Sequence, residues 1–313
     1  MSSSIEKAAQ RLQQLRQAGA QIPDGTSVPS TATPAAGGTR PQPAGSGGGR
    51  TGAGEVSGTR HVELDLDALA TAGYVTPSAL RSAVADQFRV IKRPLIANAM
   101  GKGAAPVVNG NLIMVTSALP GEGKSFTALN LALSMAMEFD HTVMLVDADV
   151  ARPSMMRVLG LPPAPGLMEL LLGHKKDVSD VLLRTNVEKL TLLPSGTQHE
   201  CATELLASET MTRLIEDIGQ RYEDRIIVFD SPPLLLTTES RVLATHMGQI
   251  VLVVQAEKTL QSQVRHALST IESCPVKLML LNKARAAGQD AYGYGYGYGY
   301  GYGQNSQVAE ATS

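Results

Sequence analysis

The chain has 313 residues, a formal net charge of −2 and hydrophobic side chains at 43% of its positions. This length leaves room for one sizeable α/β domain with a real core, and the nearly balanced charge argues against nucleic acid as a partner. Cys201 and Cys274 lie far apart without a metal-ligand spacing, and we find neither a signal peptide nor an apolar run of about 18 residues. We therefore expect a cytoplasmic protein with reduced thiols and no membrane span of its own.

The first sixty residues are predicted to form a short helix and a linker. In residues 1–20 the apolar side chains, such as Leu12 and Leu15, recur at helical spacing behind a serine cluster that can cap the helix. This amphipathic helix either docks on its own domain or is the binding site for a partner protein. Residues 21–60 consist mainly of Gly, Pro, Ser, Thr and Ala, which predicts a disordered linker.

A helical module is expected at residues 61–110. Its main helix has an apolar face made of Leu80, Val84, Phe88 and Ile91. Pro94 is expected to disrupt this helix, because proline has no backbone N–H and its ring collides with the preceding turn.

The core is predicted to occupy residues 111–290. Six apolar runs of strand length stand at about 112–116, 142–146, 190–193, 226–229, 250–254 and 278–281. Helical stretches are expected at about 125–137, 204–221, 234–247 and 260–273. Alternation of this kind is typical of a parallel sheet with helices on both faces. The predicted fold class is therefore a doubly wound, mostly parallel α/β sheet.

A glycine-rich run, SALPGEGKS at residues 117–125, follows the first core strand and has the shape of a P-loop. Such a loop turns its backbone N–H groups toward phosphate oxygens, while a lysine reaches the β and γ phosphates and a serine hydroxyl holds Mg²⁺. Ala118 replaces the first glycine of the pattern, but the strand before and the helix after are the context that the motif requires. The residues predicted to bind ATP here are Pro120, Gly121, Glu122, Gly123, Lys124, Ser125 and Phe126.

Two further strands end in aspartates. Asp147 and Asp149 stand in VDADVARP, and Asp230 stands in VFDSPP. Because the carboxyl ends of parallel strands meet at one edge of a sheet, we expect these carboxylates to converge on the P-loop. An aspartate after a strand can also be a helix cap, so the combination with the P-loop carries the prediction. Asp230 then contacts Mg²⁺ directly or through water, while one of the other two assists the metal and the other takes a proton.

The tail, residues 291–313, holds six of the chain's eight tyrosines, alternating with glycine. Glycine at every second position and the absence of aliphatic residues in the repeat predict disorder, with every hydroxyl exposed. The segment from Gly288 to Tyr302 can extend by up to about 50 Å, which reaches a neighbouring subunit. An alternative interpretation is a low-complexity segment for self-association. The predicted phosphate acceptors are Tyr292, Tyr294, Tyr296, Tyr298, Tyr300 and Tyr302.

Together, SALPGEGKS, LVDADVARP and VFDSPP resemble, in order and spacing, the three motifs of the bacterial tyrosine kinases of polysaccharide export loci. The helix DQFRVIKR resembles that family's oligomerisation motif, and the tyrosine tail is another of its hallmarks. The resemblance covers roughly residues 78–302. The opening MSSSIEKAAQRLQQLRQAG, the linker and FRVIKRPLI are similar, more specifically, to the soluble autokinases found beside exosortase and exopolysaccharide genes.

The resemblance implies an autophosphorylating protein-tyrosine kinase that uses ATP and Mg²⁺ and transfers the γ-phosphate to tail tyrosines, in trans between subunits. It assigns catalytic roles to Lys124, Asp147 and Asp149, with Asp147 aligning the acceptor hydroxyl and taking its proton. It assigns Mg²⁺ to Ser125, Asp149 and Asp230. Asn282 would contact the adenine, although a polar residue that merely ends a strand is an equal alternative.

The resemblance also implies partners. These are further copies of the chain, forming a homo-oligomer that can be a ring, and a membrane-embedded polysaccharide chain-length or copolymerase protein that activates the kinase. The kinase would then sit peripherally at the inner membrane, regulate exopolysaccharide biosynthesis and export, and have other tyrosine substrates.

Two positions depart from the family pattern. The arginine of its second motif would fall at Ala151, with Arg152 one place later, and the oligomerisation motif appears as Asp86, Arg89 and Lys92. The alternative from another class is a nucleotide-switched positioning ATPase of the partitioning or division-site type. The P-loops of that class carry an extra lysine where this chain has Leu119.

Overall fold

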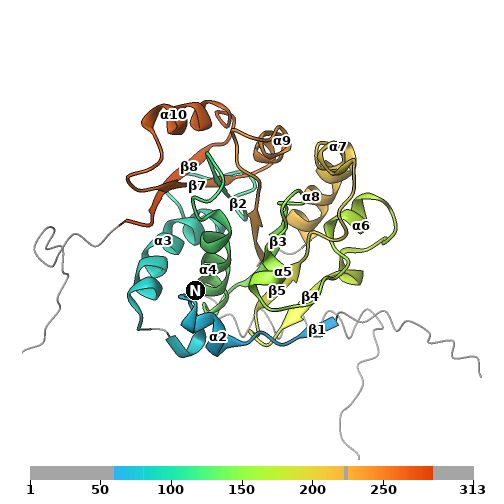
Figure 1. Cartoon of the computed structure of the whole chain (residues 1–313), viewed down its shortest axis with the longest axis horizontal. Helices are drawn as coiled ribbons and strands as arrows, with labels where there is room; N and C mark the ends of the chain where they lie inside the picture. The colour runs from blue at the N-terminus through green and yellow to red at the C-terminus, as the bar shows by residue number, and fades with distance from the viewer. Residues whose placement is uncertain (1–59, 80, 222–224, 285–313) are drawn as a thin grey trace, which may run out of the picture. The chain divides into compact units, whose positions relative to one another are not determined.

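A computed structural model of the chain describes residues 60–79, 81–221 and 225–284. In these residues eight strands form one sheet in the order β1-β4-β5-β3-β6-β2-β7-β8 (Figure 1). Only β4 and β5 pair antiparallel, and every other neighbouring pair is parallel. The predicted α/β class with a mostly parallel sheet is confirmed. The strands are β1 (Arg60–Val62), β2 (Leu112–Ser117), β3 (Thr142–Asp147), β4 (Leu183–Thr185), β5 (Leu190–Leu193), β6 (Arg225–Asp230), β7 (Gln249–Gln255) and β8 (Val276–Asn282).

Helices cover both faces of this sheet, because the side chains of the central strands alternate between two hydrophobic clusters. Along β2, Ile113 and Val115 face the cluster that holds α2, α3 and α4, while Leu112 and Met114 face the cluster that holds α6 to α10. The helices are α2 (Leu66–Thr71), α3 (Ala83–Ala99), α4 (Lys124–Ala136), α5 (Met155–Val158), α6 (Leu167–Leu171), α7 (Ala202–Leu206), α8 (Glu209–Arg221), α9 (Glu239–Thr245) and α10 (Gln261–Ser269).

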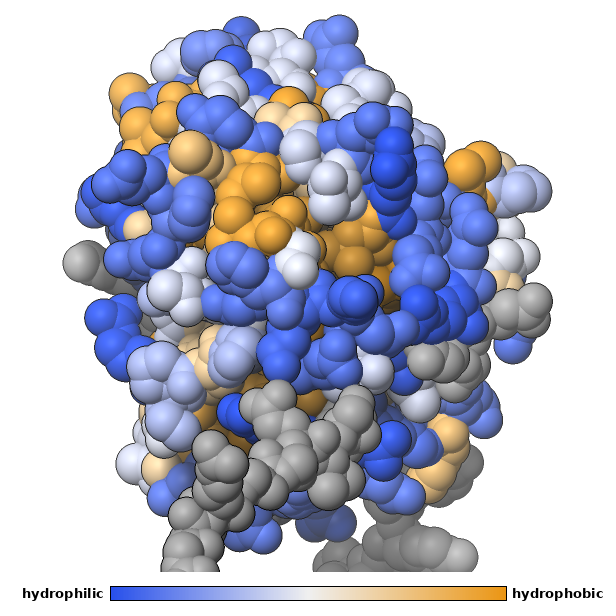
Figure 2. All heavy atoms as spheres, turned by 90° about the vertical axis from the view of Figure 1, so that its right-hand side faces the viewer, coloured by the Kyte–Doolittle hydropathy of each residue, from blue (hydrophilic) through white to orange (hydrophobic). Residues whose placement is uncertain are grey.

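The segment before the P-loop shares its core with the rest of the sheet. Leu69 and Val75 are buried in the same cluster as α4, and β1 pairs with β4. Residues 61–110 thus contribute α2, α3 and most of β1, which pack on the sheet and share its hydrophobic core. Most of the face shown in Figure 2 is hydrophilic, with hydrophobic residues gathered near its middle and in smaller groups toward its edges.

The prediction that Pro94 would disrupt its helix is wrong, because α3 runs through this residue. Phe88 and Leu95, one on each side of the proline, are 5% and 0% exposed, so packing against the sheet holds both halves of the helix in line. The carbonyl that loses its hydrogen bond belongs to Val90, whose side chain is 72% exposed, so water can hydrate it. Val84 and Ile91 pack against the same cluster, as the pattern predicts, while Leu80 lies outside the described residues.

Lys92 ties α3 to α4. Its ammonium donates to the carbonyl oxygen of Ser134 at 2.6 Å and pairs with the Glu138 carboxylate at 2.7 Å. Asp86 and Arg89, the other charges of the motif that resembles an oligomerisation element, form an ion pair on the exposed side of α3. Lys92 therefore faces inward and is not on the outer surface that these two residues share.

Two predicted helices differ from the observed ones. The stretch at 204–221 is divided between α7 and α8, because the Ser208 hydroxyl accepts from the Met211 N–H and starts a new helix. The stretch at 234–247 becomes helical only at Glu239. Before it, the backbone N–H of Leu234 donates to the carbonyl of Ser117, which holds this segment against the end of β2 instead.

Several predictions lie outside the described residues. They concern the helix at 1–20, the linker at 21–60 apart from its last residue, and the tail with its six tyrosines. Within the described ranges, no helix has the length and apolar character needed to cross a membrane.

Candidate active site at the carboxyl edge of the sheet

The P-loop connects β2 to α4 at the centre of the sheet. Gly121 and Gly123 have φ angles of 83° and 101°, a left-handed conformation that favours glycine. At Gly123 an added Cβ would also collide with the side-chain amide of Asn282. The glycines that the motif predicted are therefore required by backbone conformation and, at Gly123, by close packing as well.

Buried polar contacts hold this loop from behind. Glu122 is 3% exposed, and its carboxylate accepts from the backbone N–H of Leu119 at 2.7 Å and from the Thr259 hydroxyl. The side-chain amide of Asn282 donates to the carbonyl oxygen of Glu122 at 2.9 Å. Asn282 thus positions the loop, whereas its contact with adenine stays a prediction. The sequence did not predict the hydrogen bond between Thr259 and Glu122, because 137 positions separate the two residues.

Lys124 brings the predicted acidic residues together. Its ammonium lies 2.6 Å from the Asp149 carboxylate, 3.4 Å from that of Asp230 and 3.2 Å from the Ser125 hydroxyl. Burial by itself lowers the pKa of Lys124, but the charges of Asp230 and Asp149 outweigh it, and the pKa is raised. The lysine is therefore held in its charged form, as binding of phosphate requires.

Asp147 and Asp230 face each other across β3 and β6, and both are almost without solvent exposure. Burial raises the pKa of Asp147 to about 7, and the Asp230 charge adds to this rise. Burial likewise raises the pKa of Asp230. One oxygen of Asp147 accepts from the Met155 N–H at 3.2 Å, while the other has no hydrogen-bond partner among the described residues.

This set of donors fits Mg²⁺ bound together with phosphates. Asp149 and Asp230 share the single ammonium of Lys124, and Asp147 lies beside Asp230 with one oxygen that has no hydrogen-bond partner among the described residues. The three carboxylates therefore leave an excess of negative charge that a divalent cation would neutralise. Mg²⁺ is held in proteins by one or two carboxylates, a hydroxyl and substrate phosphates rather than by a protein cage. Accordingly, the described residues contain no cluster of three acidic, histidine or cysteine side chains suited to hold a metal by themselves.

A hollow of about 640 Å³ opens in front of the loop, and we call it the phosphate hollow. Asp149 lines it, whereas Asp147 does not. Ala151 and Arg152 both line it, so an arginine reaches the hollow although it stands one place later than in the family pattern. The predicted site residues that line the hollow are Pro120, Gly121, Gly123, Lys124, Ser125, Phe126 and Asp149.

Tyr74 lies next to this site, which its position in the sequence did not indicate. Its ring packs on that of Phe126 with 5.0 Å between the centroids, and the neighbouring Val75 N–H donates to the Asn130 side chain of α4 at 2.7 Å. Burial and the charge of Asp230 raise the pKa of Tyr74. The ring therefore supports the first turn of α4 with a neutral hydroxyl.

Comparison with known proteins places this site in a family. The sequence profile of the AAA domain family matches residues 110–281, more than half of the chain. The chain is 33% identical over 183 residues to tyrosine-protein kinase YwqD of Bacillus subtilis, a match that covers 58% of this chain and 76% of YwqD. The chain belongs to the bacterial tyrosine-protein kinases. Another member, CpsD of Streptococcus agalactiae, is 32% identical over 175 residues, 55% of this chain and 75% of CpsD.

Solved structures agree with this assignment. The chimerical protein CapA2B2 superimposes on this kinase with a TM-score of 0.55 at 26% identity, over 68% of this chain and 97% of CapA2B2. The kinase domain of VpsO gives a TM-score of 0.53 at 28% identity, over 65% of this chain and 100% of that domain. Some relatives are much longer: this chain spans 22% of the putative tyrosine-protein kinase EpsB of Ralstonia nicotianae. The predicted kinase family is confirmed, while its exosortase-associated subtype stays a prediction.

Proposed function

We propose that this kinase transfers the γ-phosphate of ATP to its own tail tyrosines and so regulates the synthesis and export of an exopolysaccharide. The observation that carries this proposal is the Lys124 ammonium held between Asp149 and Asp230 at the end of the P-loop, on a chain that also carries six tyrosines in one short repeat. The site supplies charge neutralisation, and the tail supplies the acceptor.

Phosphoryl transfer depends mainly on positioning and on neutralising charge. We assign phosphate binding to Lys124 and the backbone N–H groups of the loop. We assign Mg²⁺ binding to Ser125, Asp149 and Asp230. When bound, Mg²⁺ would neutralise negative charge on the phosphates. The hydroxyl of Ser125 already lies 3.2 Å from Lys124, so these groups need little rearrangement to act together.

We assign to Asp147 the role of the base that accepts the hydroxyl proton of the acceptor tyrosine. A base works best when its pKa lies near the working pH, and the Asp147 pKa of about 7 supports this role. Because Asp147 is buried and does not line the phosphate hollow, this role requires the site to open enough for the acceptor hydroxyl to reach its carboxylate. Asp147→Asn should then lower the rate of transfer at saturating Mg²⁺, while Asp149→Asn should chiefly raise the Mg²⁺ concentration that is needed. The opposite pattern would exchange the two roles.

The direct test is incubation of the purified full chain with γ-³²P-ATP and Mg²⁺, with phosphotyrosine located by mass spectrometry. The wild type is compared with Lys124→Met, with a truncation after Gln289 and with Lys176→Met, a matched control at an exposed lysine. We expect label on the tail tyrosines of the wild type and the control only. ATP hydrolysis without label, even with a candidate membrane activator added, would favour the positioning ATPase.

Transfer between subunits is a further part of the proposal. The truncated chain can act only as an enzyme and the Lys124→Met chain only as an acceptor, so a mixture of the two tests transfer in trans. We expect label on the Lys124→Met tail that rises with the concentration of the truncated chain. Absence of label in the mixture, with label in the wild type, would show transfer within one chain.

We also propose that the kinase forms a homo-oligomer and is activated by a membrane-embedded polysaccharide chain-length protein. The likeness to CapA2B2 and to CapB of Staphylococcus aureus, which is 28% identical over 86% of CapB, supports this part. Sedimentation velocity with and without ATP and Mg²⁺ measures the oligomer. Addition of cytoplasmic segments of candidate activators to the labelling reaction tests activation, which we expect to raise the rate of labelling.

A further inference from the structure

The outer edge of β8 is left open in the described part of the chain. β8 is the last strand of the sheet and pairs only with β7 there. Exposed edge strands are usually protected by charges, prolines, bulges or a covering segment, since their free N–H and C=O groups can pair with another strand. The sequence of β8, VKLMLLN, contains a single charge, and its Met279 and Leu281 are 64% and 65% exposed.

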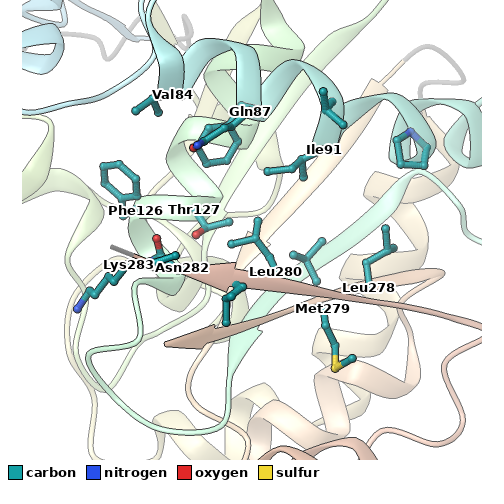
Figure 3. A pocket seen from close by; sticks show the side chains of 16 residues that line it. Val84, Gln87, Ile91, Phe126, Thr127, Leu278, Met279, Leu280, Asn282 and Lys283 are labelled. Carbon is teal, nitrogen blue, oxygen red and sulfur yellow. The ribbon is translucent and has the colours of Figure 1, made fainter. Parts of the chain in front are cut away.

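An apolar groove of about 720 Å³ runs along this strand, between β8 and α3. Figure 3 shows Leu278 and Leu280 extending from β8 toward α3, with Val84 and Ile91 facing them from the helix, while Met279 extends the other way. The end of the groove at Lys283 lies beside the P-loop, because the Lys283 ammonium donates to the carbonyl oxygen of Gly121, and Phe126 lines both this end and the phosphate hollow. We call this feature the α3–β8 groove. It combines unpaired backbone groups with an apolar wall, which is what an added strand with large side chains on one face requires.

The tyrosine tail is tethered beside this groove. The described chain ends at Ala284, immediately after β8, and Lys283 has a φ of 57°, a left-handed conformation in which the chain turns. Tyr292 follows eight residues after Ala284, and eight residues span at most about 27 Å. A strand of seven residues is about 23 Å long. The tail can therefore fold back along the strand that precedes it, at the high effective concentration that a short tether gives.

The period of the tail matches the geometry of an added strand. Successive side chains of an extended chain point to opposite faces, so every tyrosine of the repeat faces one side and every glycine the other. A partner for the seven residues of β8 carries three or four tyrosine rings. Tyrosine favours strands, whereas glycine in a strand weakens it, so the hydrogen bonds of the open edge would have to stabilise the added strand.

We propose that the unphosphorylated tail, residues 292–302, docks on β8 of its own chain as an added antiparallel strand, with tyrosine rings in the α3–β8 groove. Docking holds the acceptors away from the phosphate hollow. A phosphotyrosine carries about 1.5 to 2 negative charges, which an apolar groove does not accommodate, so phosphorylation releases the tail. The release rests on the proposed kinase function, whereas the docking does not.

Hydrogen–deuterium exchange tests the docking without ATP. The full-length Lys124→Met chain, which stays unphosphorylated, is compared with the same chain truncated after Gln289. We expect peptides that cover Val276–Asn282 to exchange at least tenfold more slowly when the tail is present. Equal exchange in the two chains would overturn the proposal, whether or not the wild type proves to phosphorylate its own tail.

Two substitutions separate docking in the groove from a general effect of the tail. Val90→Glu places a charge at the rim of the groove on an exposed side chain, and we expect it to speed exchange in β8 as much as truncation does. Val108→Glu, at a position 80% exposed outside the groove, is the matched control and should change nothing. Equal effects of the two substitutions, or none from either, would overturn the groove as the site.

The identity of the docked tail is tested by dilution. Protection by a chain's own tail does not depend on protein concentration, whereas protection by the tail of a second copy is lost on dilution. Six Tyr→Ser substitutions in the tail should remove the protection as completely as truncation. Protection that survives them would mean pairing through the backbone alone and would overturn the role of the rings. If the proposed kinase function holds, wild-type chain phosphorylated by ATP should lose the protection as well.

Discussion

β2 and β8 are both parallel strands with mostly apolar sequences, LIMVTS and VKLMLLN, yet β2 is an interior strand of the sheet and β8 is an edge strand. β2 lies between β6 and β7, and all six of its residues are buried. β8 lies at the edge, and its residues alternate between half-buried and exposed. The two strands differ in their neighbours far more than in their composition.

The difference explains where each part of the function is placed. A strand fixed on both sides and both faces holds the P-loop rigidly, so the lysine and the carboxylates stay in register for phosphate. A strand with one free edge has unpaired backbone groups and an uncovered apolar face, which suit binding of an extended peptide. Catalysis at the centre and peptide binding at the edge are therefore two consequences of one strand order.

The largest effect is expected at the carboxyl edge of the central strands. Asp230→Asn removes a carboxylate from the proposed Mg²⁺ site and should lower the rate of tail labelling at least about a hundredfold. Asp217→Asn, at an exposed ion pair on α8, is the matched control and should stay within about twofold. The measurement is the initial rate of ³²P incorporation at saturating ATP. A loss of less than tenfold for Asp230→Asn would contradict its assignment to the metal.

A gain in stability is expected from Asp147→Asn in nucleotide-free protein. The folded protein raises the pKa of Asp147 from 3.8 to about 7, so the folded state binds the proton more tightly and stability falls as the pH rises from about 4 to 7. Above pH 7 the buried charge costs on the order of 4 kcal/mol. Asparagine carries no charge, so the free energy of unfolding should increase by up to that amount at pH 8 and by little near pH 4.

Urea unfolding in the presence of EDTA at both pH values measures this gain. A variant that is less stable than the wild type at pH 8 would show that the charged carboxylate is compensated in the folded protein.

A pair of methionines compares the two strands directly. Met114 of β2 is fully buried, so Met114→Ala should lower the free energy of unfolding by about 2–5 kcal/mol through lost contacts and a cavity. Met279 of β8 is 64% exposed, and Met279→Ala should change it by no more than about 0.5 kcal/mol. Both are measured by urea unfolding in the chain truncated after Gln289, so that the tail does not contribute. Equal losses would mean that the edge strand is covered in solution.

The smallest effect is expected at the contact between α3 and α4. The hydrogen bond from Lys92 lowers the pKa of Glu138, so its contribution to stability is present above the ordinary value of 4.5 and is lost as the pH falls below it. Because 42% of the Glu138 side chain is exposed, Glu138→Gln should cost less than about 1 kcal/mol at pH 7 and nothing at pH 3. Glu209→Gln, in an exposed pair on α8, is the control. A cost that persists at pH 3 would point to packing instead of charge.

The sequence predicted the strands and the loop that build the candidate site, because their signals are local. The glycines of the P-loop, Lys124 and Ser125 stand in one short run, and the strands before Asp147 and Asp230 are continuous apolar segments. The strands β1 and β4 were not predicted, since each has only three residues, and β1 joins the sheet as an edge strand only by pairing with β4. Segments this short carry no periodicity, and the residues that pair between β1 and β4 lie more than a hundred positions apart.

Tertiary structure decided what each predicted residue faces. Asp147 and Asp149 are the same residue type two positions apart. The side chain of Asp147 is fully buried, with a pKa of about 7, whereas Asp149 lines the phosphate hollow. Lys92 turned inward onto α4, and α3 continued through Pro94, because packing against the sheet outweighs one lost hydrogen bond. The sequence by itself determined the six longer strands, the turn of the P-loop and the reactive groups, which depend on neighbours along the chain. Burial, pKa and the open edge of β8 depend on neighbours in space, and those are set by the order of strands in the sheet.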